Sequence, residues 1–97
     1  MNYRATVITF LTLFNDPMTV PETLVSSRDK AEAIKAAQAL VGEEDVILAI
    51  SLYQSTADAP ERVEFWSARD IYGEELGKSN TKVGRNVRRI KRDLGSL

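Results

Sequence analysis

Hydrophobic positions near the start of the chain follow the pattern of β-strands. Residues 3–14 are a β-branched and aromatic run with apolar side chains on both alternating sets, which is typical of a central strand buried on both faces. Turn-forming residues at 15–17 predict that the chain returns as a second strand over residues 18–25. Pro21 has no backbone N–H, so we expect this strand to lie at an edge of the sheet or to contain a bulge.

The middle of the chain alternates helical and strand periods. Ser26 and Asp29 have the spacing of a capping box, and the apolar positions over residues 31–41 then repeat along one face of a helix. A second apolar run predicts a strand over residues 46–55, and a shorter one predicts a fourth strand over residues 62–66.

The last third of the chain has helical periodicity only. Ser67 and Asp70 form a second capping box, which predicts a short helix over residues 68–76. Ser79 or Asn80 can cap a third helix. Its apolar stripe consists of Val83, Val87, Ile90 and Leu94.

These elements predict an α+β fold in the order ββαββαα. We expect a small, mostly antiparallel sheet of three to four strands with one packed helix and a C-terminal helical pair. A chain of 97 residues is sufficient for one hydrophobic core, so we expect a single domain. Residues 1–66 would form the sheet and its helix, and residues 67–97 the basic helical pair.

The composition restricts the chemistry. The chain has neither cysteine nor histidine, which removes the usual zinc ligands, the commonest general base and the strongest nucleophile. The remaining candidates for acid–base work or magnesium binding are two acidic runs, Glu43-Glu44-Asp45 and Glu74-Glu75. Both lie at the ends of predicted elements, where solvated acids are common. We therefore expect a binding protein that is not an enzyme and has no cofactor, no metal and no catalytic residues.

The apolar runs are also informative about location. Residues 5–14 and 46–53 are about half the length that spans a bilayer, and the N-terminal segment lacks the pattern of a signal peptide. We expect no membrane association. The absence of cysteine fits a reducing compartment, and we expect the cytoplasm.

Charge is distributed unevenly along the chain. Residues 1–77 have thirteen acidic and six basic side chains, whereas residues 78–97 have seven basic and one acidic. An acidic body is therefore followed by a basic C-terminal segment. Such asymmetry indicates a nucleic acid or another polyanion as partner, or attraction between the two parts of the chain.

Basic side chains of the last predicted helix lie opposite its apolar stripe and on its flanks. Those opposite the stripe are Arg85, Arg88, Arg89 and Arg92, and those on the flanks are Lys82 and Lys91. Guanidinium groups bind phosphate in a bidentate manner and can also recognise the edge of guanine in a major groove. The alternative is a solvated helix face or one docked on the acidic body through weak ion pairs.

Residues 71–87, Ile-Tyr-Gly-Glu-Glu-Leu-Gly-Lys-Ser-Asn-Thr-Lys-Val-Gly-Arg-Asn-Val, resemble the helix-turn-helix of bacterial and phage DNA-binding proteins. The resemblance implies that Gly73 lets the two helices approach, that Leu76 and Val83 fill their crossing, that Gly77 makes the turn and that Ser79 opens the recognition helix.

The same resemblance places Asn80, Thr81, Lys82 and Arg85 nearest to bases or phosphates of double-stranded DNA. Residues 65–71 with Leu76-Gly77 are also similar to the start of phage antirepressor domains of the Bro type.

Two alternatives concern protein partners. The chain resembles, in length and acidity, the small orphan proteins that phages encode to bind and inhibit a host protein. In that case the acidic body presents a negative surface to a basic partner. Its acids are Glu22, Glu43, Glu44, Asp45, Asp58 and Glu61. An exposed strand edge would also allow a homodimer.

Overall fold

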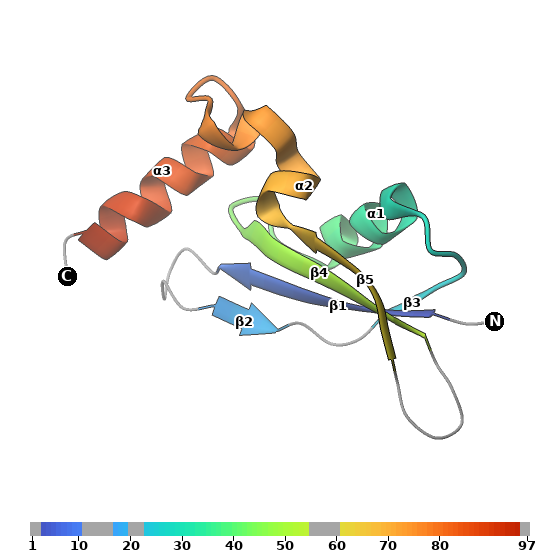
Figure 1. The fold of residues 1–97 in the computed structure, drawn as a ribbon. Helices are drawn as coiled ribbons and strands as arrows, with labels where there is room; N and C mark the ends of the chain where they lie inside the picture. The colour runs from blue at the N-terminus through green and yellow to red at the C-terminus, as the bar shows by residue number, and fades with distance from the viewer. Residues whose placement is uncertain (1–2, 11–16, 20–22, 55–60, 96–97) are drawn as a thin grey trace.

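An antiparallel β-sheet forms the centre of the molecule, with two helices over one face and a third beyond one end (Figure 1). The computed structural model describes residues 3–10, 17–19, 23–54 and 61–95, and only the backbone of residues 8–10, 17–19 and 91–95. The elements are β1 (Tyr3–Phe10), β2 (Pro17–Thr19), β3 (Thr23–Val25), α1 (Lys30–Leu40), β4 (Val46–Gln54), β5 (Glu61–Ser67), α2 (Ala68–Tyr72), the 3₁₀-helix η1 (Gly73–Gly77) and α3 (Lys82–Gly95).

The strands confirm the predicted α+β order. β1 and β4 pair along their length and form the centre, β5 pairs with the outer side of β4, and β2 and β3 pair with different parts of the other side of β1. The single strand predicted over residues 18–25 is instead two short strands, β2 and β3, and both lie on the outer side of β1, so only the expected edge position is confirmed. Pro21 itself, and the predicted continuation of the first strand over residues 11–14, lie outside the described residues.

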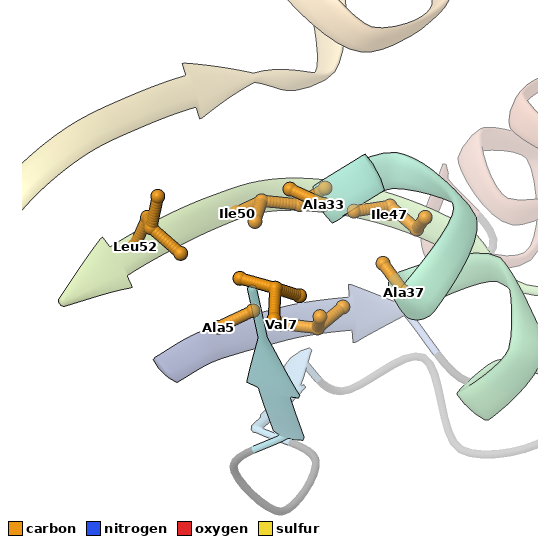
Figure 2. Close-up of a cluster of buried hydrophobic side chains, with 8 residues drawn as sticks. Ala5, Val7, Ala33, Ala37, Ile47, Ile50 and Leu52 are labelled. Atoms are coloured by element: carbon orange, nitrogen blue, oxygen red, sulfur yellow. The ribbon is translucent and has the colours of Figure 1, made fainter. Parts of the chain in front are cut away.

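The main hydrophobic cluster lies between α1 and the central strands (Figure 2). Ala33 and Ala37 of α1 are both fully buried. They are four residues apart and therefore share one side of the helix. Two small side chains on this side leave room for Ile50 and Leu52 of β4 and for Val7 of β1. Of the described side chains of β1, Ala5 and Val7 are buried toward α1, whereas Arg4 is exposed and Thr6 is half-buried on the other face. The expectation that this strand is buried on both faces is therefore wrong for its described part.

The start of α1 differs from the expected capping box. Asp29 is the N-cap and accepts a hydrogen bond from the Ala31 N–H at 3.2 Å. Ser26 instead donates from both its N–H and its hydroxyl to Glu32, and the Ser27 hydroxyl donates to the same carboxylate. These hydrogen bonds, led by that of the Ser26 hydroxyl, lower the pKa of Glu32 to about 2. Glu32 thereby fastens the segment before the helix to its first turn.

The second capping box is confirmed. The Ser67 hydroxyl accepts from the Asp70 N–H, and the Asp70 carboxylate accepts from the Ser67 N–H. The backbone hydrogen bond from Ser67 is the main cause of a lowered pKa of Asp70. The α-helix ends at Tyr72 rather than at Leu76, because Gly73 has a left-handed φ of 63° and the chain continues as η1.

Tyr72 connects the sheet with the C-terminal helices. Its hydroxyl oxygen accepts a hydrogen bond from the Ile47 N–H at 3.0 Å, next to an irregularity in the pairing of β1 with β4. Burial raises the pKa of Tyr72, since the charged phenolate would lose its hydration. The ring packs against both hydrophobic clusters.

The second cluster holds α3 in place. Val83 and Ile90 are buried against Val46, and Leu76 and Val87 pack around them. This confirms the predicted stripe at three of its four positions, while the side chain of the fourth, Leu94, lies outside those described. Leu76 of η1 and Val83 of α3 thus belong to one cluster.

Candidate nucleic-acid interface

The turn before α3 is held by Thr81. Its hydroxyl oxygen accepts from the Gly84 N–H at 3.0 Å, the pattern of an N-cap, and lies 2.8 Å from the Glu75 carbonyl oxygen and 2.9 Å from that of Lys78. Thr81 is therefore the capping residue, not Ser79 or Asn80. The same hydroxyl also links α3 to η1, which fixes the angle at which α3 leaves the turn.

The close contact between the two helical segments involves Gly84 rather than Gly73. A Cβ built on Gly84 would lie 1.7 Å from the Lys78 carbonyl oxygen. A Cβ built on Gly73 would meet nothing within 4 Å, so Gly73 is needed for its left-handed backbone and not for packing. The role that the resemblance gave to Gly73 is therefore wrong for this chain, and Gly84 takes it.

The basic face of α3 divides into two lines of side chains. Arg85 and Arg88 lie on the line opposite the buried stripe, and both are exposed. Among the described residues, neither makes an ion pair or a hydrogen bond. Lys82, Asn86 and Arg89 lie on the neighbouring line, which is turned toward the loop between α1 and β4.

That loop is acidic and contacts the second line. We call residues 43–45 the acidic loop. The Lys82 ammonium lies 3.8 Å from the Glu43 carboxylate, and the Arg89 guanidinium lies 3.5 Å from that of Glu44. The side chains of Glu43 and Glu44 are 89% and 65% exposed, so both ion pairs are at the surface and weak.

Hydrogen bonds fix the acidic loop and Asn86. The Asp45 carboxylate accepts from the Gly42 N–H at 2.9 Å, which closes the loop. The Asn86 amide donates to the Glu43 carbonyl oxygen at 3.0 Å, and its oxygen accepts from Arg89 at 3.4 Å. A cleft of about 360 Å³ separates the loop from the first turns of α3. The loop therefore contacts α3 through polar groups and without tight packing.

The structure thus separates the predicted site residues. Arg85 and Arg88 are exposed and face away from the body, and Asn80 is exposed in the turn. Lys82 and Arg89 have acidic neighbours in the chain itself. Thr81 is occupied as a cap. Arg92 lies in α3, but its side chain is outside those described.

Sequence reasoning missed Asn86. It belongs to the same surface as Lys82 and Arg89, where it orients the Arg89 guanidinium. The only sequence signal is its spacing, four residues after Lys82 and three before Arg89, which puts all three on one side of a helix.

Comparison of the chain with family models, curated proteins and solved structures finds no match. Within the described part of the chain, no acidic side chains gather in a group of three or more that could hold a metal ion. No helix among the described residues has the length and apolarity to cross a membrane.

Proposed function

We propose that the protein binds double-stranded DNA through the exposed face of α3. The observation that supports this most is the arrangement of Arg85 and Arg88, which project from the side opposite the buried stripe. They are one turn apart, and no carboxylate of the described residues pairs with them. Guanidinium groups in this arrangement suit phosphate oxygens or guanine edges.

The placement of α3 leaves room for a duplex. The helix lies beyond one end of the sheet, in a molecule whose principal extents are 46 × 25 × 18 Å (Figure 1). Its 14 residues span about 21 Å, and a helix of ordinary diameter fits a major groove. The turn with Asn80 and Lys78 precedes it and is exposed, so both side chains are accessible to a partner.

The alternative, a basic host protein bound by the acidic body, has less support. Glu43 and Glu44 of the acidic loop contact α3, and Asp45 binds the Gly42 N–H. These carboxylates act within the chain. Of the other acids named for that surface, Glu22 and Asp58 lie outside the described residues.

The test is a fluorescence-anisotropy titration with a labelled random duplex at several salt concentrations. The double variant Arg85→Gln/Arg88→Gln should bind more weakly. If each arginine neutralises one phosphate, the slope of log affinity against log salt should flatten by about 0.9 for each one lost. Lys30→Gln/Lys35→Gln is the matched control, because it removes two exposed positive charges from α1 and should leave the slope unchanged.

Two outcomes would remove the proposal. One is duplex affinity that does not change with salt. The other is that the Arg85→Gln/Arg88→Gln variant loses no more duplex affinity than the Lys30→Gln/Lys35→Gln control does.

A further inference from the structure

The face of the sheet turned away from α1 has a different composition from the face toward α1. Cross-strand neighbours share a face, and the pairing aligns Leu24, Arg4, Tyr53 and Arg62 in one row across β3, β1, β4 and β5. Arg4 alternates with the buried Ala5, and Tyr53 with the buried Leu52, so this row lies opposite α1. The next row contains Thr6, Ser51 and Phe65.

Phe65 is the most informative residue of this face. It is 51% exposed, whereas its neighbour Trp66 turns to the other face and packs against the main cluster. The Arg62 guanidinium lies over the Phe65 ring, 5.2 Å from its centre. Tyr53, next to Arg62 in the register, is half-buried. The edge of this face therefore presents two aromatic rings beside a guanidinium.

The described side chains of this face include two arginines and no carboxylate. The nearest acids point to the other face: Glu64 is aligned with the buried Leu52 and pairs with Arg28 at 2.8 Å, and Glu61 is aligned with Gln54. Arg62 pairs with no carboxylate of the described residues, so this part of the face carries a positive charge and its partner is expected to be negative. A second copy is disfavoured, since a two-fold interface would bring the arginines of one copy toward those of the other.

We propose that this face binds single-stranded nucleic acid. An unpaired strand offers what the face can recognise: bases with free π-faces, which stack on Phe65 and Tyr53, and phosphates, which pair with Arg62. A duplex keeps its bases stacked inside, so it cannot use the rings. This surface is separate from α3 and does not depend on duplex binding.

The experiment is an anisotropy titration with a fluorescein-labelled 20-residue oligodeoxythymidine at low salt. Phe65→Leu keeps an apolar side chain but removes the ring, and should weaken binding about tenfold, while Phe65→Tyr keeps the ring and should bind as the wild type does. Arg62→Gln should weaken binding and reduce its salt dependence. Arg69→Gln, which removes an exposed positive charge from α2, should have little effect.

A duplex titration with the same variants separates the two proposals. Phe65→Leu should leave duplex affinity unchanged, whichever way the α3 variants behave. The proposal is overturned if Phe65→Leu and Phe65→Tyr bind the oligonucleotide equally, or if Arg62→Gln is no weaker than Arg69→Gln. It is also overturned if Phe65→Leu abolishes a concentration-dependent dimer without changing oligonucleotide affinity. Urea unfolding of each variant excludes a folding defect, which is not expected at a half-exposed position.

Discussion

Gly84→Ala tests whether the joint between η1 and α3 is as close as the structure indicates. The added methyl carbon would lie 1.7 Å from the Lys78 carbonyl oxygen and 2.8 Å from the Thr81 hydroxyl oxygen, far inside van der Waals contact. Both obstacles belong to the turn that caps α3, so the turn must move. Overpacking of this kind costs about 3 kcal/mol, and alanine regains about 1 kcal/mol over glycine in a helix. We expect a net loss of about 2 kcal/mol in the free energy of unfolding.

Urea unfolding followed by the fluorescence of Trp66, the only tryptophan, measures this loss. Gly77→Ala is the matched control, because its Cβ would meet nothing within 4 Å and its backbone is not left-handed. The control should change the free energy of unfolding by less than about 0.5 kcal/mol. If Gly84→Ala is as stable as the wild type, or more stable as helix propensity alone would have it, the close contact does not exist.

Three further predictions concern polar groups. Glu32 has a pKa of about 2 in the folded protein against an ordinary value of 4.5, so its stabilising effect is complete above pH 4.5 and is lost as the pH falls toward 2. Glu32→Gln should remove that part of the acid sensitivity in unfolding experiments. An NMR titration midpoint of Glu32 near pH 4.5 would contradict this prediction. Tyr72→Phe leaves the Ile47 N–H without its acceptor and should lower the free energy of unfolding by about 1 kcal/mol, whereas an unchanged urea midpoint would argue against the hydrogen bond. Glu44→Gln removes the carboxylate beside Arg89 and should raise duplex affinity by at most about fivefold, because an exposed ion pair contributes roughly 1 kcal/mol or less. Weaker duplex binding by this variant would refute competition between the Glu44 carboxylate and phosphate for Arg89.

The sequence was sufficient for the elements whose signals are local. Runs of β-branched and other apolar residues located the central strands, and the spacing of Val83, Val87 and Ile90 located α3 and its buried side. The Ser67–Asp70 capping box was also recognised, because both partners lie within one turn. Local periodicity and short-range hydrogen bonds are the physical basis of these successes.

Errors arose where several residues of one type compete for one role. Ser26 precedes Asp29 at the spacing of a capping box, yet Asp29 caps α1 and Ser26 binds Glu32. Ser79, Asn80 and Thr81 are all suitable N-caps. Thr81 takes this position, with its hydroxyl also in contact with the Glu75 carbonyl oxygen of η1. Both outcomes depend on where the neighbouring segment lies.

The sequence predicts which basic residues belong to the candidate site, but not which of them are exposed and which contact the acidic loop. Sequence periodicity places the arginines of α3 opposite the apolar stripe. It cannot show that the acidic loop, more than forty residues earlier, lies beside Arg89 and leaves Arg85 and Arg88 exposed. That division follows from the packing of α3 on Val46 and Tyr72, which is a tertiary contact.

The most direct measurement for the proposed function is an NMR titration of the isotope-labelled protein with a short DNA duplex at low salt. Binding through α3 predicts that the largest shifts occur at the Nε–H groups of Arg85 and Arg88 and at the backbone of the turn before them, with the α1 side of the sheet unchanged. Shifts that are absent from α3, or confined to the acidic loop or the sheet, would contradict it.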